Sequence, residues 1–491
     1  MNDFSKNIDF KGLFNPKTIA LIGATVFPNK WGFIVLANII KGGYEGKIFP
    51  VNPNYDNILG IPSYASLSKI DEKVDLAIIT TPAKTVLGII DECIAKGIPN
   101  AIVITSNFSE VGEEGTLLEK EVVLKANAGG MNLVGPNTMG IYSSSVNLTA
   151  LMPPINPLHG SVSMVSQSGN IGTQIMDWCE SQGIGFSKFV SSGNEGDICC
   201  EDYLEYFGSD NETDVIVLYI ESVKDGNRFL EIAKKTSQKK PIILFKGGKT
   251  NAGMSAAASH TGALAGSIDI YRTAFRQAGI IEAISTQEIV DLIAGFLSFP
   301  LPKGNRVGIL TRGGGWGVIT ADECEANGLE LPSLSTNIFD KFNKILPQYW
   351  SKGNPIDMVA VVQTEPFIEC LNILASWKNV DSVISLGGMV DDSFLKSFND
   401  QKFLDHMGIS GSDMKLVSDQ FKEECVKLKQ LTKGLMDEFD KPIISIEIGN
   451  GHNSKENLIE HGFATYPTPE RGVYVLHKLY EYASFRNRVG R

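Results

Sequence analysis

The chain of 491 residues repeats one local pattern, in which an apolar run is followed by a glycine-containing or polar turn and then by a helix-like stretch. Residues 17–24 (KTIALIGA) form the first run, and 75–82 (DLAIITTP), 100–106 (NAIVITS) and 131–137 (MNLVGPN) continue the series. Strands that alternate with helices form parallel sheets with helices on both faces. We therefore predict an α/β protein built from doubly wound sheets. Ligands of such sheets bind at the carboxyl ends of the strands, where these turns fall.

An internal repeat indicates the domain organisation. Residues 163–185 (SMVSQSGNIGTQIMDWCESQGIG) align without gaps with residues 308–330 (GILTRGGGWGVITADECEANGLE). Further along, GNEGDI at 193–198 has a counterpart in GNPIDM at 353–358. Two copies of one strand, loop and helix predict two similar α/β domains after the first unit.

These observations predict three domains, at residues 1–150, 151–298 and 299–491. The joint LSFPLPKGN at 297–305 has the proline and glycine content of a linker. Within the last domain, residues 391–440 are predicted to form a mostly helical elaboration, because LVSDQFKEECVKLKQLTKGLMDEF has helical periodicity.

Composition excludes several classes of protein. Apolar residues make up 43% and charged residues 20% of the chain, which is typical of a globular protein. No apolar run approaches the roughly 20 residues of a membrane span, and MNDFSKNIDF is not a secretory signal, so we expect no membrane association. Seven cysteines without CxxC spacing indicate reduced thiols in the cytoplasm. The net charge of −12 disfavours nucleic acid, so an anionic ligand must be held by backbone NH groups and a few lysines.

The turn GATVFPNKWG at residues 23–32 links the first strand to a helix, which is a setting that presents backbone NH groups to phosphate. It lacks the GxGxxG pattern, so an ordinary strand-to-helix turn is an equal alternative. Further polar strand ends at VNP (51–53), TTPA (80–83) and ITSNF (104–108) fall on the same rim. Together they predict a groove for a nucleotide-like ligand, with Lys30 near its phosphates.

The turn SQSGNIG at residues 166–172 opens a helix with serines and glycines, as anion-binding nests do. The alternative is a tight turn whose small residues permit close packing. Its copy, TRGGGWG at 311–317, has lost both serines and gained Arg312, so it is either structural or contacts an anion by charge.

His260 lies in FKGGKTNAGMSAAASHTGALAGS (245–267), where small residues replace the large apolar neighbours of an ordinary core histidine. A histidine that accepts a phosphoryl group needs this clearance for in-line attack. The alternative is a surface loop with an incidental histidine. A nucleophilic histidine also needs a hydrogen-bond acceptor for its second ring nitrogen. The apolar strand VIVLYIES (215–222) offers Glu221 near its end for this role. A glutamate at a strand end is, however, more often a solvated charge.

These motifs, in this order, resemble the alpha subunit of ADP-forming acetyl-CoA synthetases, which are relatives of the succinyl-CoA synthetase alpha subunit. The resemblance is carried by NPKTIALIGA with PNKWG, VNP, LVGPNTMGI, VSQSGNIG, SSGNEGDI, YIESVKDG and ASHTGALAGS, over about residues 10 to 300. It implies a Rossmann-like CoA-binding domain followed by two flavodoxin-like domains of the succinyl-CoA synthetase type. The last third matches less well, because TRGGGWG departs from the usual TNAGGPG.

The resemblance also implies site residues. His260 would be the phosphorylated histidine and Glu221 its carboxylate partner. The phosphoryl group would be held by Ser166, Gln167, Ser168, Gly169 and Asn170. Coenzyme A would contact Gly23, Ala24, Thr25, Pro28, Lys30, Val51, Pro53, Thr80, Pro82, Thr105, Ser106 and, near its thioester end, Asn137.

The implied reaction interconverts acyl-CoA, ADP and phosphate with a carboxylic acid, CoA and ATP, through acyl phosphate and phosphohistidine. The chain contains no P-loop motif and no evident magnesium site. We therefore expect a hetero-oligomer in which an ATP-grasp beta-type subunit binds ADP or ATP and Mg²⁺. Two other functions stay open: a non-catalytic CoA or acyl-CoA-binding regulatory subunit, and a nicotinamide-dependent oxidoreductase, which the missing GxGxxG weakens.

Overall fold

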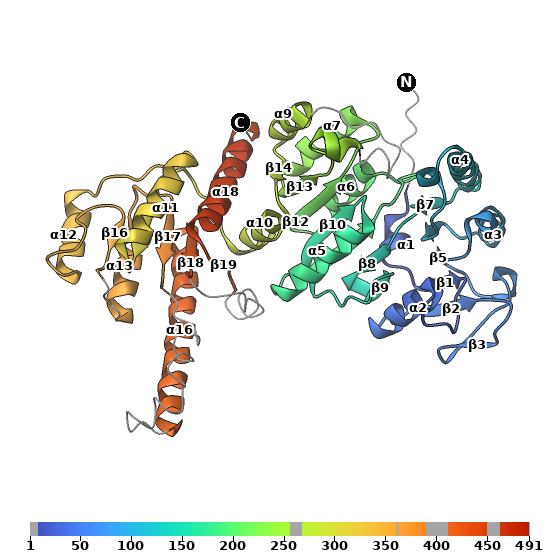
Figure 1. Ribbon diagram of the computed structural model, residues 1–491, viewed down its shortest axis with the longest axis horizontal. Helices are drawn as coiled ribbons and strands as arrows, with labels where there is room; N and C mark the ends of the chain where they lie inside the picture. The colour runs from blue at the N-terminus through green and yellow to red at the C-terminus, as the bar shows by residue number, and fades with distance from the viewer. Residues whose placement is uncertain are drawn as a thin grey trace. The chain divides into compact units, whose positions relative to one another are not determined.

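A computed structural model describes residues 8–255, 268–359, 361, 363–388, 411–448 and 462–490 (Figure 1). The chain divides into two compact units. Unit 1 comprises Met1–Glu180 and Ile184–Ile289, and unit 2 comprises Ser181–Gly183 and Val290–Arg491. The described part of unit 1 contains two large sheets, and that of unit 2 contains one.

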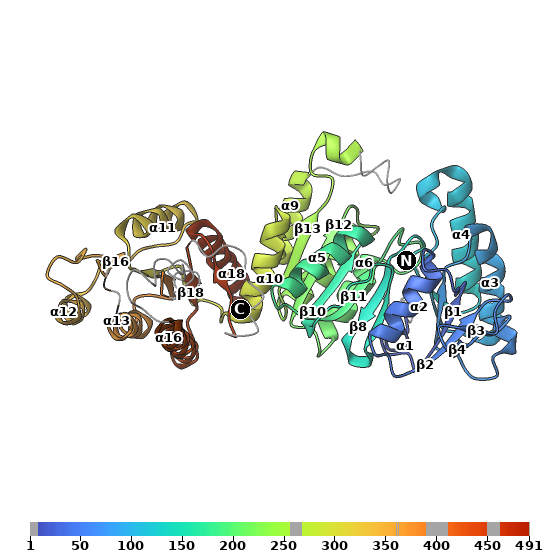
Figure 2. The ribbon, with the colours of Figure 1, turned by 60° about the horizontal axis from the view of Figure 1, so that its bottom comes forward.

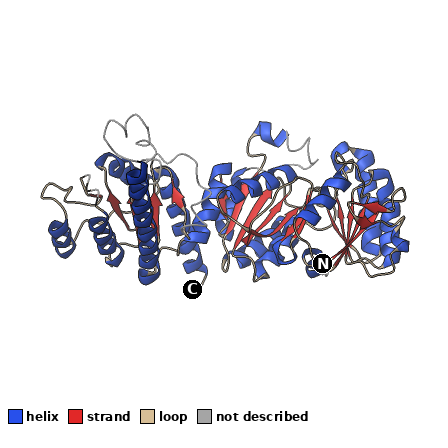
Figure 3. Cartoon of the chain, turned by 90° about the horizontal axis from the view of Figure 1, so that it is seen from below, coloured by secondary structure: helices blue, strands red, loops and turns tan. Residues whose placement is uncertain are grey.

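The first sheet of unit 1 is wholly parallel and has the order β2-β1-β5-β6-β7. Its strands are almost continuously buried, because helices cover both faces and leave no polar side to the sheet (Figure 3). The strands are β1 (Thr18–Ile22), β2 (Lys47–Val51), β5 (Leu76–Ile79), β6 (Asn100–Val103) and β7 (Asn132–Val134). The helices are α2 (Trp31–Lys41), α3 (Ala83–Lys96) and α4 (Glu113–Ala128), with short turns η1 (Leu67–Lys69) and η2 (Ser109–Val111) and a small β3 (Asn57–Ile58) and β4 (Ile61–Pro62) ribbon.

The second sheet of unit 1 has the order β14-β13-β12-β10-β11-β8-β9. Its five parallel strands are β10 (His159–Ser166), β11 (Phe186–Ser191), β12 (Val215–Ile220), β13 (Ile242–Lys246) and β14 (Ile281–Ala283). The helices around it are α5 (Gly169–Ser181), α6 (Cys200–Ser209), α7 (Gly226–Ser237), α9 (Ile268–Ala278) and α10 (Thr286–Ser298), the last of which crosses from unit 1 into unit 2.

An antiparallel hairpin extends the second sheet, formed by β8 (Gly140–Ser143) and β9 (Leu148–Leu151) around the turn η3 (Ser144–Val146). All of the hairpin except Leu151 lies in the segment 1–150 that we assigned to the first domain, yet its strand β8 pairs with β11. Helix α2 packs on β9, where the Asn38 side chain donates a hydrogen bond to the carbonyl of Leu151 at 2.7 Å. The two sheets of unit 1 are therefore joined by backbone pairing and packing.

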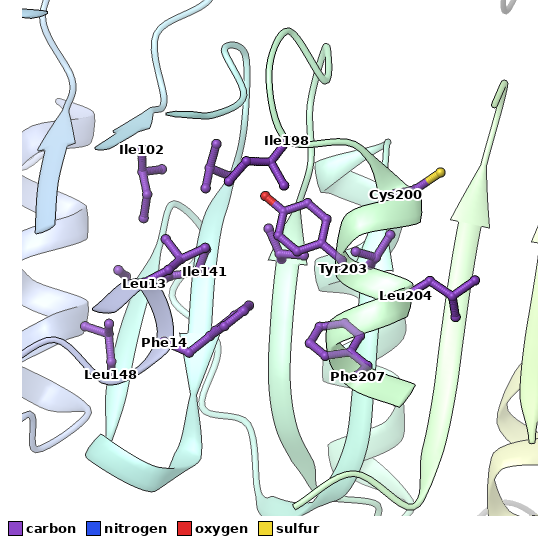
Figure 4. Packing of buried hydrophobic residues seen from close by; sticks show 14 of the residues in the cluster. Leu13, Phe14, Ile102, Ile141, Leu148, Ile198, Cys200, Tyr203, Leu204 and Phe207 are labelled. Atoms are coloured by element: carbon purple, nitrogen blue, oxygen red, sulfur yellow. The ribbon is translucent and has the colours of Figure 1, made fainter. Parts of the chain in front are cut away.

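The hydrophobic core of unit 1 also joins the two sheets. Helix α1 (Phe10–Phe14) places Leu13 and Phe14 beside Ile141 of β8, and Tyr203 and Phe207 of α6 lie beyond them (Figure 4). All of these side chains are fully buried. Such apolar burial stabilises the fold by roughly 1.5–3 kcal/mol for each large side chain. The short N-terminal helix therefore contributes to the core that positions both sheets.

Unit 2 has one parallel sheet with the order β16-β15-β17-β18-β19. Its strands are β15 (Val307–Thr311), β16 (Ile356–Asp357), β17 (Ser382–Leu386), β18 (Ile443–Ile446) and β19 (Thr465–Tyr466). Its helices are α11 (Gly314–Ala326) and α18 (Pro469–Val489) on one face, and α12 (Thr336–Ile345), α13 (Thr364–Ser376) and α16 (Gly411–Phe439) on the other (Figure 2). All three sheets thus share one order of parallel strands, the flavodoxin-like 2-1-3-4-5.

The internal repeat is confirmed residue by residue in its first part. Strand β10 ends at Ser166 and β15 at Thr311, and helix α5 (Gly169–Ser181) has the same aligned bounds as α11 (Gly314–Ala326). The second part of the alignment was wrong. Ser166 pairs with Ser191 and Thr311 pairs with Asp357, so GNPIDM contains the strand itself, whereas GNEGDI follows its strand.

The predicted helical elaboration is helical over the residues the structure describes there, because α16 spans Gly411–Phe439. Residues 389–410 lie outside the described residues. Helix α16 is the crossover between β17 and β18, as α7 is between β12 and β13. The segment 411–439 is therefore the crossover helix of this sheet, with 29 residues compared with 12 in α7.

No helix in the described ranges is both long and apolar enough to cross a membrane. All seven cysteines lie in described positions and none is in a disulfide, and four of them are found in helices α3, α5, α11 and α13, where their side chains are buried.

Candidate functional site

The turns that follow the strands of the first sheet form a connected row at its carboxyl edge. Thr80 after β5 donates a hydrogen bond from Oγ1 to the carbonyl of Ile22 at 3.0 Å, and Thr105 after β6 donates to the carbonyl of Thr81 at 2.6 Å. The row ends at Asn137 after β7, whose backbone NH donates to the carbonyl of Thr105 at 2.9 Å. The structure thus brings the predicted strand ends together.

The turn after β1 is shaped by close backbone contact. Gly23 has φ +90°, and a Cβ on Gly32 would lie 2.0 Å from the carbonyl oxygen of Gly23. Glycine at position 32 therefore lets the first turn of α2 rest on this carbonyl. Helix α2 begins after Lys30, and no side chain caps its first NH groups. Unpaired NH groups at a helix start are donors suited to phosphate.

The predicted CoA contacts differ in exposure. Pro28, Lys30, Pro53, Pro82 and Ser106 are exposed. The partly exposed positions are Gly23, Thr80, Thr105 and Asn137. The remaining ones, Ala24, Thr25 and Val51, are buried, and Val51 packs in the apolar core of the first sheet. Only the backbone of Val51 can therefore face a ligand at this edge.

The turn between β10 and α5 combines a buried hydroxyl with an exposed helix start. Ser166 is fully buried and donates a hydrogen bond from Oγ to the carbonyl of Ser168 at 2.5 Å, whereas Ser168, Gly169 and Asn170 are at least partly accessible. A Cβ on Gly169 would lie 2.1 Å from Cγ of Met139, and one on Gly172 would lie 2.7 Å from a carbon of Phe189. The glycines therefore serve close packing and leave the NH groups of the first helical turn accessible.

Gln167 of this turn is bound to the end of the neighbouring strand β12. Its Oε1 accepts hydrogen bonds from the NH groups of Glu221 at 2.6 Å and Ser222 at 3.1 Å. Its Nε2 donates to the carbonyl of Ser222 and to Oε2 of Glu195, both at 2.9 Å. Its own NH donates to the carbonyl of Tyr219 at 3.1 Å. The donors of Gln167 are therefore directed at protein acceptors.

Glu221 presents a buried carboxylate beside the β10–α5 turn. Its side chain is 8% exposed, and Oε1 accepts a hydrogen bond from the hydroxyl of Tyr219 at 3.3 Å. Oε2 is buried and has no hydrogen-bond partner among the residues that the structure describes. Its carbonyl accepts from Nζ of the buried Lys246 at 2.7 Å, and burial lowers the pKa of that lysine. An unpaired buried carboxylate oxygen is costly, so this site is suited to a hydrogen-bond donor.

His260, the central prediction from the sequence, lies in the segment 256–267, outside the described residues. The described chain approaches this segment at residue 255 and resumes at residue 268 with α9.

Glu195 is a buried carboxyl that the sequence analysis quoted within GNEGDI but did not assign. It is 2% exposed, has φ +52°, and accepts a hydrogen bond from the hydroxyl of Ser192 at 2.7 Å. Burial raises the pKa of Glu195 to about 8. Only its place in the short loop GNEGDI could have indicated a role, because its burial arises from tertiary packing.

One group in the described ranges has the spacing of a metal site: Glu195, Cys200 and Glu201, whose ligand atoms lie within 4.8 Å of one another. The Cys200 thiol already donates to Oε2 of Glu201 at 3.4 Å, and Oε1 of Glu201 accepts from the NH of Asp225 at 2.9 Å. Burial raises the pKa of the Cys200 thiol well above its usual range. Metal ligands must be deprotonated, so this group fits a structural hydrogen-bond cluster better.

Models of three families match the chain: a CoA binding domain at residues 17–144, a succinyl-CoA ligase-like flavodoxin domain at 159–296 and a Ligase-CoA domain at 307–371. The alpha subunit of acetate–CoA ligase [ADP-forming] II from Pyrococcus furiosus is 42% identical over 373 residues, which cover 76% of this chain and 81% of that protein. The alpha subunit of isoenzyme I from the same organism is 35% identical over 98% of this chain and 99% of its own length.

The chain belongs to the family of ADP-forming acetate–CoA ligase alpha subunits. The acetyl-coenzyme A synthetase 1 of Ca. Korarchaeum cryptofilum, solved in complex with phosphate and ADP, has a similar fold, with a TM-score of 0.84 and 33% identity over 98% of both chains. Family membership confirms the predicted order of a CoA-binding domain followed by flavodoxin-like domains and favours a ligase over a nicotinamide-dependent oxidoreductase. Some members are longer, since the chain spans 54% and 50% of two of them.

Proposed function

We propose that the chain is the alpha-type subunit of an acyl-CoA synthetase that transfers phosphate between acyl phosphate and ADP through phosphorylated His260. The observation that carries this proposal is the buried Oε2 of Glu221, which lacks a partner among the described residues and lies at a strand end beside an accessible helix start. An imidazole NH is a fitting donor for such an oxygen. The remaining ring nitrogen is then unprotonated, as a nucleophile requires.

The first step takes place where CoA and phosphate meet. A phosphate oxygen attacks the thioester carbon, the carbon–sulfur bond breaks, and CoA leaves with the proton lost by phosphate. We propose that CoA lies across the carboxyl edge of the first sheet, between the turns of Gly23 and Thr80, with Lys30 near its phosphates and Asn137 near its thioester. Support comes from the continuous row of strand ends and from the hydrogen bond of Asn137 to Asn194, in the loop after β11, at 3.1 Å.

The second step moves the phosphoryl group to the histidine. The imidazole nitrogen attacks phosphorus and the carboxylic acid leaves as its anion. The phosphoryl oxygens would be held by the NH groups at the start of α5, around Ser168, Gly169 and Asn170, with Ser166 fixing the turn. These groups are positioned before the reaction, so they stabilise charge without reorganising.

The last step requires a nucleotide site. We propose that an ATP-grasp beta-type subunit supplies it, holds ADP with Mg²⁺ and forms a hetero-oligomer with this chain. Relatives of nearly the same length are named as alpha subunits, which supports a separate partner. We also propose that the domains 1–150, 151–298 and 299–491 divide the work into CoA binding, phosphohistidine chemistry and a second flavodoxin-like unit, in line with the three family segments.

The test mixes the chain with its candidate partner, Mg²⁺ and ATP labelled at the γ-phosphate. We expect an acid-labile, base-stable label on this chain, and none on the His260→Ala variant. His159→Ala is the matched control, because His159 lies at the exposed start of β10 and should keep the label. Label that persists in His260→Ala, or that stays on the partner alone, contradicts the proposal. CoA binding without any label would favour the regulatory-subunit alternative.

Acetate is the first acid to test in the full reaction, because the alpha subunits similar to this chain are named for it. The formation of ATP from ADP, phosphate and an acyl-CoA is then measured for acetyl-CoA and for a panel of other thioesters. The thioester that gives the fastest formation of ATP identifies the acid that this chain uses.

A further inference from the structure

The carboxamide of Gln167 has one orientation that satisfies all its neighbours. Its oxygen faces two donors, the NH groups of Glu221 and Ser222, and its nitrogen faces two acceptors, the Ser222 carbonyl and Oε2 of Glu195. A flipped amide would set donor against donor at the two NH groups and acceptor against acceptor at the Ser222 carbonyl. Gln167 therefore ties the β10–α5 turn to the residue that carries the unpaired carboxylate.

Among the described residues, Glu195 supplies the one side-chain contact of Gln167 that lies outside β12 and the two residues after it. Its second oxygen is fixed by Ser192, so the carboxyl cannot turn away from Gln167. A glutamate with φ +52° is in the left-handed region, which is unfavourable for residues other than glycine. The loop that imposes this conformation is itself anchored, because Asn194 donates to carboxylates of Glu110 and Glu119 at 2.7 and 2.9 Å.

We propose that Gln167 is a positioning residue for phosphoryl transfer, that it fixes Glu221 by holding the end of β12, and that Glu195 acts only through Gln167 by fixing the orientation of its carboxamide. This inference rests on the proposed function, since it assumes that Glu221 orients His260. It gives Gln167 a role different from contact with the phosphoryl group. The phosphoryl group is then held by the helix start, and Gln167 connects that start to the carboxylate.

The test compares labelling rates of the chain with its partner, Mg²⁺ and labelled ATP. Gln167→Met keeps the length of the side chain and removes all four hydrogen bonds, and we expect it to slow labelling about 100-fold, because two partly buried NH groups lose their acceptor. Glu195→Met should slow labelling about 10-fold. Glu195→Gln still offers an oxygen to Gln167 and should stay within about 3-fold of the wild-type rate.

The double variant Gln167→Met/Glu195→Met decides between positioning and independent structural roles. If Glu195 acts through Gln167, the second substitution adds nothing, and the double variant matches Gln167→Met within about 2-fold. The matched control is Gln174→Met on the exposed side of α5, which should label at the wild-type rate. CoA affinity should be unchanged in every variant, because no substituted side chain lies in the row of turns on the first sheet.

Three results overturn the inference: wild-type labelling of Gln167→Met, multiplied effects in the double variant, or a Glu195→Gln variant as slow as Glu195→Met. If Gln167→Met does not fold, comparison of Glu195→Met with Glu195→Gln still tests the inference. Only Glu195→Met removes the oxygen that accepts the hydrogen bond from Gln167. Failure of the proposed function gives a different result, since the wild-type chain itself then carries no label on His260.

Discussion

The turn between β10 and α5 and its copy between β15 and α11 have the same backbone plan. In each, a buried hydroxyl at the strand end donates to the carbonyl two residues later, from Ser166 to Ser168 at 2.5 Å and from Thr311 to Gly313 at 2.9 Å. The helix begins one residue after that carbonyl. The backbone alone therefore does not explain why one turn would hold phosphate and the other would not.

The two turns differ in the charge beside the helix start. A Cβ on Gly169 would lie 2.8 Å from Oγ of Ser191, whereas a Cβ on Gly314 would lie 2.7 Å from Oδ2 of Asp357. The strand registers make Ser191 and Asp357 equivalent. A carboxylate already complements the start of α11, while the start of α5 faces a neutral hydroxyl. If the start of α5 holds the phosphoryl group, as we propose, one side chain on the neighbouring strand distinguishes this turn from its copy.

Exchanging this side chain gives the largest expected effect. Ser191→Asp places a carboxylate where the phosphoryl group would lie, and two like charges about 4 Å apart repel by about 4 kcal/mol at an effective dielectric constant of 20. We expect the labelling rate of His260 to fall at least about 100-fold. Ser191→Asn introduces a neutral side chain of the same size as aspartate, so it separates the effect of charge from the effect of size. Its labelling rate should fall much less than that of Ser191→Asp. The reverse change, Asp357→Ser, should leave labelling unchanged, and equal losses in the Asp and Asn variants would contradict the charge argument.

Much of this comparison could be predicted from the sequence. Buried parallel strands are continuous apolar runs, so TIALI at 18–22 and VIVLYI at 215–220 were recognisable, and the gapless repeat gave the aligned bounds of α5 and α11. The carboxylate that distinguishes the two turns was not predictable. Strand β16 has only two residues, which produce no apolar run, so the glycine–asparagine pairs at 193 and 353 were aligned instead of the strands.

The roles of Glu195 and Gln167 were hidden for a different reason. Both occur in motifs that the sequence analysis singled out, but their contact depends on how the loop after β11 folds over the β10–α5 turn. The same holds for the hairpin 140–151, whose residues precede the second sheet in the chain and pair with it in space. Pattern gives the elements and their order, whereas contacts between loops depend on tertiary packing.

The glycines that follow the two turns give the next largest effect. A Cβ on Gly172 would lie 2.7 Å from a Phe189 ring carbon and from Cβ of Ser166, whereas a Cβ on Gly317 would lie 3.0 Å from Cγ2 of Thr311. We expect Gly172→Ala to reduce the free energy of unfolding by about 2–3 kcal/mol and Gly317→Ala by less than about 1 kcal/mol. Urea unfolding of the full chain measures both. Equal losses would show that the two helices approach their sheets equally closely.

The pH dependence of stability should also distinguish the loop after β11 from the loop after β16. The first carries the buried carboxyl of Glu195, four residues after Ser191, whereas the residue four positions after Asp357 is Val361. Burial raises the pKa of Glu195 to about 8, so between the ordinary glutamate value and pH 8 the folded chain binds one proton more than the unfolded chain. Stability from this group is therefore complete at acid pH and decreases as pH rises, by up to about 1.4 kcal/mol per pH unit. Groups facing Glu195 are Ser192, Gln167, Lys224, Glu201, Cys199, Cys200 and Tyr203.

Glu195→Gln removes this titration. The difference in unfolding free energy between variant and wild type should grow from pH 5.5 to pH 8 and then become constant. Glu121→Gln, which changes an exposed carboxylate on α4, is the matched control and should give a flat difference. Parallel curves for wild type and Glu195→Gln would show that the carboxyl is ionised in the folded chain throughout this range.

The smallest effect is expected at Arg312, which occupies in the second turn the position of Gln167 in the first. Its guanidinium lies 4.7 Å from the Phe367 ring, burial lowers its pKa, and Nε is buried without a hydrogen-bond partner in the described part of the chain. Arg312→Gln removes the stabilising contact with the ring and also removes the destabilising unpaired NH, each worth about 1 kcal/mol. The two contributions nearly cancel, so the free energy of unfolding should change by less than about 1 kcal/mol. Labelling of His260 should stay within about 2-fold of wild type. A loss of more than 10-fold would mean that the second turn handles an anion through this guanidinium, and the carboxylate of Asp357 would then not be enough to make the turn purely structural.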